Sequence, residues 1–313
     1  PAEVETMMYA GEVPWHVLGT QVWEAQTSAE AIKLAGLDWT VVKRPLVAVS
    51  PCGSMISGAL TPVPGMMAVV RESDGSVLGV VSDRYEPFQN VDAFTFMDSL
   101  LQDGVLTYET AGSLFGGRRV WLLAHLDADM RVGDDDYKSY LLLSTSHDGG
   151  AAVRVLPVTT RVVCNNTLSV ALSEGKGAWV MHSRQTQSRL NRVRDLYAVT
   201  TAATRRLREW LEAARTRPVT YDVLVEVESL VTGVRVWTED EAQYSAREVE
   251  KLGRFSAIYS EESARSGETG YALACAVTGY ADHGLRYASR DPRVVADRRF
   301  VSVTDGHGPH LKS

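Results

Sequence analysis

The sequence predicts an α+β fold in which antiparallel β-hairpins form a sheet with packed helices, followed by a long arginine-rich helix and a helical C-terminal third. Three patterns support this prediction. Short apolar runs separated by glycine-containing turns recur over 66–163, apolar residues at three- and four-residue steps run through 183–217, and only helical patterns follow Pro218. The 313 residues, 45% of them hydrophobic, can bury a large core. We expect a core domain over 1–217 and a helical region over 218–313, which can pack on the core as one domain.

The chain is predicted to open with a helix and then a strand. Thr27-Ser-Ala-Glu30 is a capping-box sequence, and the short helix that follows it should stop at Gly36. Residues 39–49 are rich in β-branched side chains and favour a strand. The glycines and prolines between Pro51 and Gly65 then predict a loop.

Two hairpins and a helix are predicted next. Asp74-Gly75 lies between the apolar runs 66–70 and 77–81, which is a strong hairpin signal. Asn90 is placed to cap a helix through Leu101, whose apolar residues follow helical spacing. The runs 105–110 and 118–126 flank Gly116-Gly117 and predict a second hairpin.

An acidic loop is expected from Asp127 to Asp136, and a third hairpin from Ser139 to Val163. Asn165 or Asn166 can cap a short helix through Leu172, and Ser183 can cap the long helix to about Arg217. We place Trp210 of the long helix in its apolar stripe, with Leu190, Val193, Leu196, Ala203, Leu207, Leu211 and Ala214. Three further helices are expected from about Tyr221, from Thr238 to about Ser263, and from Thr269 to His283.

Several motifs carry a resemblance to a known family. They are the segment from Tyr140 to Leu168, which contains Ser146-His-Asp-Gly-Gly150, together with Glu5-Thr-Met7, Gly11-Glu-Val-Pro-Trp-His-Val-Leu-Gly-Thr20, Gly36-Leu-Asp-Trp39 and Ala276-Val-Thr-Gly-Tyr-Ala-Asp-His283. In these motifs, over nearly the whole chain, the sequence resembles the phage/plasmid-like family called domain of unknown function 932. The resemblance implies no reaction.

The run Ser144, Ser146, His147 and Asp148 contains the residue types of a hydrolase triad. A triad needs an imidazole that bridges the nucleophile and the acid, whereas adjacent residues of a tight turn tend to point apart. We interpret Ser146-His-Asp-Gly-Gly150 as hairpin-turn chemistry, in which Asp148 accepts backbone hydrogen bonds and the glycines adopt positive φ. A hairpin tip that contacts nucleic acid and a catalytic role are the less favoured alternatives.

Other chemistry finds little support in the sequence. Cys164, with His125, His147 or His182, offers a cysteine–histidine pair, but free cysteines are usually buried apolar groups. His307-x-x-His310 with His283 lies in a glycine- and proline-rich context without a fixed acidic or thiolate ligand, and 127–136 departs from the EF-hand pattern. The chain has no phosphate-binding Gly-x-x-x-x-Gly-Lys-Ser/Thr motif. We therefore expect no enzyme activity, no metal and no cofactor.

Composition indicates the compartment. The three cysteines form neither a disulfide framework nor zinc-ligand pairs, which favours a reducing environment. No apolar run approaches the roughly 18 residues of a membrane span. We expect a cytoplasmic protein of a bacterial host cell with no membrane partner.

Charge is distributed unevenly along the chain. The net charge is −7, yet 154–217 carry twelve basic residues against four acidic ones, an excess of eight. Such a segment is either a solvated face paired with acidic neighbours or the contact surface for an anionic partner. The six basic residues that we select as phosphate contacts are Arg154, Arg161, Lys176, Arg184, Arg189 and Arg192.

The order of hairpin strands followed by a helix also resembles phage single-strand annealing proteins of the RecT/Redβ kind. That resemblance implies a non-enzymatic, ATP-independent DNA recombination activity, in which rings or filaments of subunits hold single-stranded DNA without regard to sequence until a complementary strand pairs. The alternative is an oligomeric assembly or interaction protein of a phage. Its C-terminal helices would form the oligomer surface, and its arginines would form ion pairs between subunits.

Overall fold

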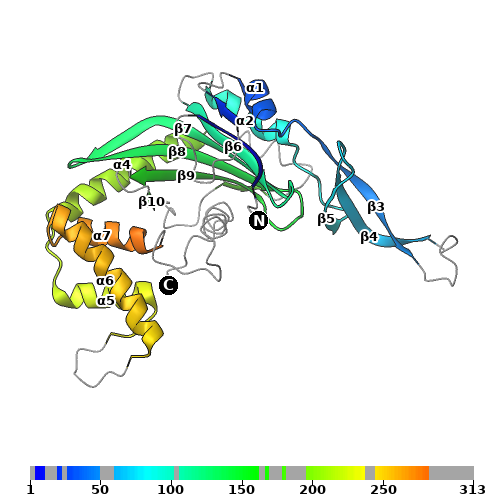
Figure 1. Cartoon of the computed structure of the whole chain (residues 1–313). Coiled ribbons are helices and arrows are strands. Elements are labelled where there is room, and N and C mark those ends of the chain that lie inside the picture. The colour runs from blue at the N-terminus through cyan, green and yellow to red at the C-terminus, as the bar shows by residue number, and fades with distance from the viewer. Residues whose placement is uncertain are drawn as a thin grey trace. The chain divides into compact units, whose positions relative to one another are not determined.

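The computed structural model describes residues 4–10, 20–22, 27–49, 60–101, 106–161, 166–168, 178–180, 195–236 and 244–281. In these ranges two mainly antiparallel sheets and six helices form an α+β fold, as predicted (Figure 1). The chain divides into two compact units: residues 1–127, 140–156 and 174–198 form the first, and residues 128–139, 157–173 and 199–313 form the second. The predicted domain boundary at residue 217 lies inside the second unit.

The larger sheet is built around three consecutive hairpin connections. Its strands are ordered β10-β9-β8-β7-β6-β1-β2, and β11 pairs with β9. The bounds are β1 Val4–Ala10, β2 Thr20–Val22, β6 Leu106–Leu114, β7 Arg119–Val132, β8 Asp135–Ser146, β9 Val153–Arg161, β10 Asn166–Leu168 and β11 Ala178–Val180. The predicted hairpins at Gly116-Gly117 and at Ser146–Gly150 are confirmed as the β6–β7 and β8–β9 connections.

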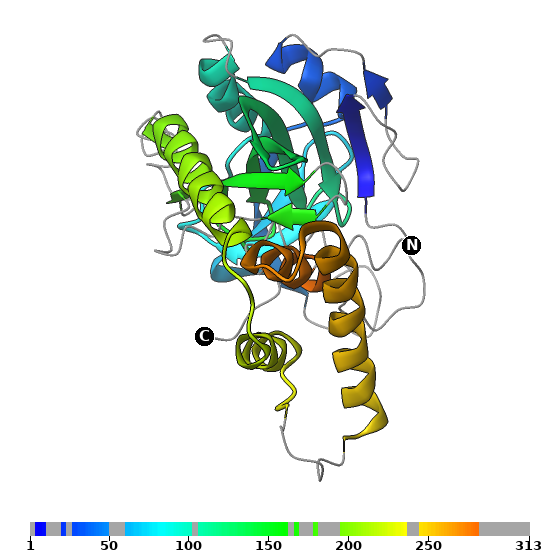
Figure 2. The same cartoon turned by 90° about the vertical axis from the view of Figure 1, so that its left-hand side faces the viewer.

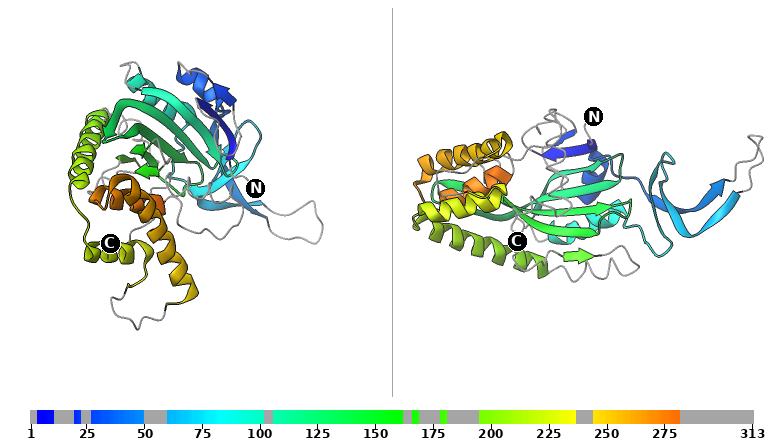
Figure 3. Two further views of the ribbon diagram at one scale, coloured as in Figure 1. Left: turned by 60° about the vertical axis from the view of Figure 1, so that its left-hand side comes forward. Right: turned by 90° about the horizontal axis from the view of Figure 1, so that it is seen from below.

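The smaller sheet has the order β3-β4-β5, with β3 Val41–Val49, β4 Leu60–Arg71 and β5 Val77–Ser82. Figure 3 shows β3 and β4 as a long two-stranded ribbon. The Asp74-Gly75 hairpin is confirmed, and Gly75 has φ +74°. The prediction of a loop through Gly65 is wrong, because β4 already begins at Leu60. β5 pairs only from Met66 onward, so among the described residues the earlier part of β4 pairs with β3 alone, and proline is tolerated at such an edge.

Two more predictions of loop or helix are wrong. The expected acidic loop 127–136 is mostly strand, since β7 runs to Val132 and β8 begins at Asp135 around Gly133, which has φ +59°. Alternating Met130 and Val132 enter a buried cluster, and this burial overrides the loop signal of the acidic residues. The expected helix at 165–172 is contradicted by β10, whose residues pair with Thr159–Arg161 of β9; residues 169–172 lie outside the described ranges.

Helices α1 Ser28–Leu34 and α2 Asn90–Leu101 belong to the first unit. The Thr27 cap is confirmed, because its hydroxyl oxygen accepts from the Glu30 backbone N–H at 3.2 Å. The prediction that Asn90 caps α2 is wrong, because Asn90 is the first residue of the helix and its side chain reaches other segments. Its Nδ2 donates to the Leu37 carbonyl at 3.0 Å.

The second unit contains α4 Asp195–Arg215, α5 Tyr221–Thr232, α6 Ala246–Ser266 and α7 Gly270–Gly279 (Figure 2). The predicted cap at Thr269 is confirmed. α6 begins at Ala246, where Ser245 and Glu248 form a capping box, whereas the predicted capping box at Thr238 lies outside the described residues. The predicted stretches 183–194 and 282–283 lie outside the described residues. α7 contributes buried side chains on two sides, and these join two clusters: Met130, Val132, Tyr137, Leu211, Ala214, Tyr271 and Cys275; and Phe255, Tyr259, Ala272, Leu273, Ala276 and Tyr280.

A buried hydroxyl network fixes α7 to the β7–β8 turn of the second unit. The Tyr271 hydroxyl donates to Asp135 Oδ2 at 2.5 Å and lies 2.7 Å from the Tyr137 hydroxyl. Burial, followed by the hydrogen bond to Asp135, raises the pKa of Tyr271 far above its ordinary value. The Tyr271 hydroxyl therefore stays protonated, and its hydrogen bonds hold the N-terminal turn of α7 in place.

Candidate nucleic-acid interface

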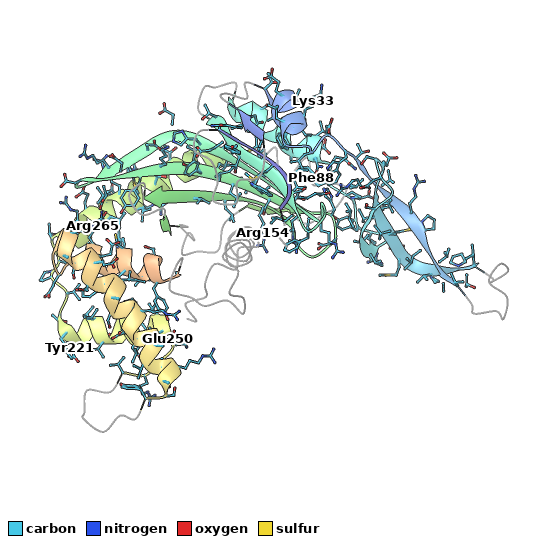
Figure 4. The ribbon with its side chains drawn as sticks, in the orientation of Figure 1. Lys33, Phe88, Arg154, Tyr221, Glu250 and Arg265 are labelled. Carbon is cyan, nitrogen blue, oxygen red and sulfur yellow. The ribbon has the colours of Figure 1, made fainter. Side chains whose placement is uncertain are left out.

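The predicted phosphate contacts are only partly described. Arg154 lies on β9 opposite Trp179 of β11, and it is only 7% exposed (Figure 4). Arg161 ends β9, and its side chain is outside the described set, as are Lys176, Arg184, Arg189 and Arg192. The guanidinium of Arg154 thus lies inside the protein rather than on an open face, and the other five residues stay a prediction.

Helix α4 presents one apolar side to the protein interior. Leu211 and Ala214 are buried, and Leu207 packs against the same cluster. These residues follow the three- and four-residue steps of a helix face, as predicted. Trp210 was expected in this stripe, but its side chain is 56% exposed. The prediction for Trp210 is wrong because 210 lies about a quarter turn away from 207 and 211 together.

The neighbouring side of α4 carries an exposed row of basic and aromatic residues. Arg206, Trp210, Ala213 and Arg217 follow one another at steps of four, three and four, which places them on one face. We call them the arginine–tryptophan row. Arg217 lies two residues beyond the end of α4, but its N–H still donates to the Ala214 carbonyl at 3.3 Å, so it continues the row. All four side chains are exposed.

The arginines of α4 differ in their ion pairs. Arg205 lies 3.9 Å from Glu209, and Arg215 lies 3.2 Å from Glu212, so these charges are partly compensated on the surface. Arg206, Arg208 and Arg217 form no ion pair with the acidic residues that the structure describes. Two of these three belong to the row. The row therefore combines an exposed indole with positive charge that no acidic residue in the described part of the chain compensates.

A pocket of about 450 Å³ adjoins the row. Trp210, Ala213 and Arg217 line it from α4 and its extension, Val227 lines it from α5, and Leu273, Ala274, Val277 and Thr278 line it from α7. Its lining is predominantly aliphatic and aromatic. An apolar hollow with a few polar groups at its border is the usual form of a small-ligand site.

Backbone hydrogen bonds fix the end of the row beside α7. The N–H of Gly270 donates to the Arg217 carbonyl at 2.8 Å, and the N–H of Val219 donates to the Glu268 carbonyl at 2.9 Å. A Cβ atom at Gly270 would lie 3.3 Å from the Ala214 carbonyl oxygen, so glycine permits this close approach. Pro218 and Thr269 form an isolated bridge at the same place. We call this contact the neck, and we call α4, α5, α6 and α7 together the helical unit.

The Ser146–Gly150 turn has the structural role that the sequence predicted. The Ser146 hydroxyl donates to the Ala151 carbonyl at 2.8 Å, and Asp148 Oδ1 accepts from the Gly150 N–H at 2.8 Å. His147 Nε2 instead donates to Asn90 Oδ1 at 2.9 Å. The three side chains point to three different partners, so they do not form a triad.

Sequence reasoning missed a partly buried ion pair of the first unit, in which the arginine is buried and the glutamate is exposed. Arg71 of β4 donates two hydrogen bonds to the Glu5 carboxylate of β1, at 2.8 and 3.0 Å, and one to the Gly116 carbonyl at 2.6 Å. Its guanidinium also lies 4.5 Å from the centre of the Trp39 ring. No local pattern could reveal this cluster, because its members come from four distant segments.

The described residues contain no group of three or more histidine, cysteine or acidic side chains able to hold a metal ion. Cys275 is buried, whereas Cys52, Cys164 and the predicted His283, His307 and His310 fall outside the described ranges. Among the helices that the structure describes, none combines the length and apolar character needed to cross a membrane.

Comparison with known proteins gives one match. No curated protein and no solved structure matches the chain, so the resemblance to RecT/Redβ-like proteins gains no support from these comparisons. A family model described as Domain of unknown function (DUF932) matches residues 77–302, which is more than half of the sequence. The chain therefore belongs to the DUF932 family.

Proposed function

We propose that this protein binds and anneals single-stranded DNA during recombination of a phage or mobile element, without ATP and without covalent chemistry. The observation that carries the proposal is the arginine–tryptophan row of α4, in which an exposed indole lies between two arginines that no described acidic residue neutralises.

This combination suits a single strand. Arginine side chains bind phosphates regardless of sequence, and an exposed aromatic ring stacks on any base. Trp210 lies one helical turn from Arg206 and two turns from Arg217, about 6 and 10 Å along the axis. Binding should therefore be independent of sequence and sensitive to salt.

The charge distribution supports the same proposal. The basic excess of eight over 154–217 includes the row, the predicted contacts Arg184, Arg189 and Arg192, and Arg161 at the end of β9. Annealing proteins of this kind act as rings or filaments, so we propose a homo-oligomer in the cytoplasm of a bacterial host. No nucleotide cofactor is required, because pairing of complementary bases supplies the free energy.

Fluorescence anisotropy of labelled single- and double-stranded oligonucleotides, at several salt concentrations, tests the proposal. We expect tight, salt-sensitive binding of the single strand, and faster pairing of complementary strands without ATP. The double variant Arg206→Glu/Arg217→Glu should lose both. The double variant Arg247→Glu/Arg265→Glu on α6 makes the same charge change at two exposed positions and should retain them. Absence of binding by the wild-type protein at low salt would contradict the proposal.

The predicted basic segment is tested separately with the triple variant Arg184→Glu/Arg189→Glu/Arg192→Glu. If these residues contact phosphates, the triple variant binds single strands more weakly, and its dependence on salt is shallower. Unchanged affinity would restrict the DNA-binding surface to the row.

A second candidate function is that of an oligomeric assembly or interaction protein without nucleic-acid activity. The apolar pocket of the helical unit favours it, because an apolar hollow beside an exposed tryptophan is a common protein-binding surface. In that case Trp210→Ala would dissociate the oligomer, which light scattering coupled to size-exclusion chromatography would detect as a lower molar mass. No variant would alter DNA binding.

A further inference from the structure

We propose that the pocket beside the row receives one unpaired nucleobase of the bound strand, with Trp210 as the stacking surface and Arg217 at the adjoining phosphate. This inference rests on the proposed function, because it takes single-stranded DNA as the ligand. It adds the part of the DNA that is recognised: an aromatic base as well as the charged backbone.

The size and lining of the pocket fit such a ligand. Its volume of about 450 Å³ lies within the range of about 300–1,000 Å³ that is usual for small-molecule sites, so it can admit a base with its sugar. Leu273, Ala274 and Val277 of α7 give it an apolar wall. Transfer of a flat base from water to this apolar wall lowers the free energy, and stacking on the indole face of Trp210 lowers it further.

Thr278 adds one polar group to the apolar wall. Its hydroxyl lies 2.9 Å from the Cys275 carbonyl and 3.2 Å from the Ala274 carbonyl, to which it can donate its single proton. The oxygen retains acceptor capacity for an N–H group of a base edge. All four DNA bases carry such a group, so this contact does not select a sequence.

Charge at the border of the pocket distinguishes a nucleic acid from an apolar peptide. Arg217 lines the pocket and Arg206 lies in the same row, and no described acidic residue forms an ion pair with either. The neck fixes the backbone of Arg217 through the Gly270 N–H, and this fixes the point from which the guanidinium extends. An occupant with an apolar ring and an adjacent anion matches both features, as a nucleotide does.

The arrangement selects single strands. A base inside a duplex is paired and stacked, and removing it from the stack costs a few kcal/mol. An unpaired base enters the pocket without this cost. One anchored base per subunit would fix the strand, while the bases between two anchors stay available to a complementary strand.

The first experiment compares an oligothymidylate with an oligomer of the same length that carries sugar and phosphate but no bases. Trp210→Ala should weaken binding of the oligothymidylate by ~5- to 150-fold, the range measured for loss of one base–aromatic stack, and leave the baseless oligomer unchanged. Trp210→Phe should restore most of the affinity. Tyr221→Ala, which removes an aromatic ring that is 67% exposed on α5, is the matched control and should change neither.

The outcomes separate the two proposals. If the wild-type protein binds neither oligomer, the proposed function fails. If it binds both and Trp210→Ala weakens neither, or weakens both equally, single-strand binding stands and the base pocket is wrong. Release of subunits by Trp210→Ala, with unchanged DNA affinity per subunit, would assign the pocket to a second copy of the chain and overturn the inference.

A second experiment avoids dependence on folding of the variant. Oligonucleotides containing 5-iodouracil are photocrosslinked to the wild-type protein, and the crosslinked peptides are identified by mass spectrometry. Crosslinks at Trp210 or at neighbouring pocket residues support the inference. Crosslinks confined to other segments would exclude it.

Discussion

The Nε2 atom of His147 donates a hydrogen bond of 2.9 Å to Oδ1 of Asn90, and both side chains are almost completely buried, with 0% and 1% exposure. Asn90 also donates to the Leu37 carbonyl at 3.0 Å. One amide group thus connects the β8–β9 turn, the start of α2 and the segment after α1. The Ser146-His-Asp-Gly-Gly150 motif consequently serves a structural purpose through a residue far away in sequence.

Asn90→Ala should lower the free energy of unfolding by about 1–3 kcal/mol, because it leaves buried groups of His147 and Leu37 without this partner. Urea denaturation measures the change. Thr95→Ala, at an exposed position of the same helix, is the control and should have little effect. Equal stability of the two variants would mean that the amide network contributes nothing.

Gly117→Ala should destabilise the protein more than Gly116→Ala does. Both glycines have positive φ, +87° and +67°, so each alanine incurs the roughly 1–2 kcal/mol cost of that conformation. Only at Gly117 would the new Cβ also lie 2.2 Å from Nη2 of Arg71, whereas nothing lies within 4 Å at Gly116. The difference between the two melting temperatures therefore reports the disturbance of Arg71, which binds Glu5, and of the Trp39 ring, which would lie 3.2 Å from the same Cβ. Identical melting temperatures would contradict this explanation.

Tyr271→Phe should lower the free energy of unfolding by about 1–3 kcal/mol, since it removes the buried donor to Asp135. Tyr137→Phe removes a hydroxyl from the same network but keeps the bond between Tyr271 and Asp135, so its effect should be smaller. Urea denaturation of both single variants and the double variant gives the coupling between the hydroxyls. Strict additivity would show that the two act independently.

Glu228 should make stability depend on pH. Burial raises the pKa of its carboxyl, and a hydrogen bond from Ser256 opposes this only in part. As pH rises above the ordinary pKa of about 4.5, the unfolded chain loses this proton before the folded chain does, so the folded state loses stability until its own raised pKa is passed. Glu228→Gln should remove that loss, as denaturation at about pH 4 and about pH 7 would reveal.

Glu248 provides the opposite case for comparison. Hydrogen bonds from the hydroxyl and the backbone N–H of Ser245 lower the pKa of its carboxyl. Its contribution is present above the ordinary pKa and disappears as pH falls through the lowered value. Glu248→Gln should therefore weaken the pH dependence on the acid side. A shift in the same direction as that of Glu228→Gln would contradict both assignments.

Local signals in the sequence predicted local structure well. Asp74-Gly75, Gly116-Gly117 and Ser146–Gly150 located their turns, because turn geometry is decided within a few residues. The acidic stretch 127–136 was misjudged for the converse reason. Its conformation depends on burial of Met130 and Val132 against helices far along the chain, which composition does not reveal.

The candidate site was only partly predictable. The spacing of Arg206, Trp210 and Arg217 can be read from the sequence, but the exposure of Trp210 cannot, because an apolar residue next to a core stripe normally joins it. The acidic partners of Arg205 and Arg215 lie within about one turn of the same helix, so they too can be read from the sequence. Arg154 shows the limit most clearly: charge suggested an open surface, and the fold placed it inside.

The pocket depends on the neck, because the neck brings together lining residues that are far apart in the sequence. Residues on either side of Pro218 and Thr269 bring together two walls that are separated by α5 and α6 in the sequence. A fragment that stops before residue 269 keeps the part of the lining that comes from α4 and α5 and lacks the part that comes from α7. Binding at this place therefore reports the cooperative folding of the whole helical unit, and an occupant would stabilise that unit by an amount that grows with the logarithm of its concentration divided by its Kd.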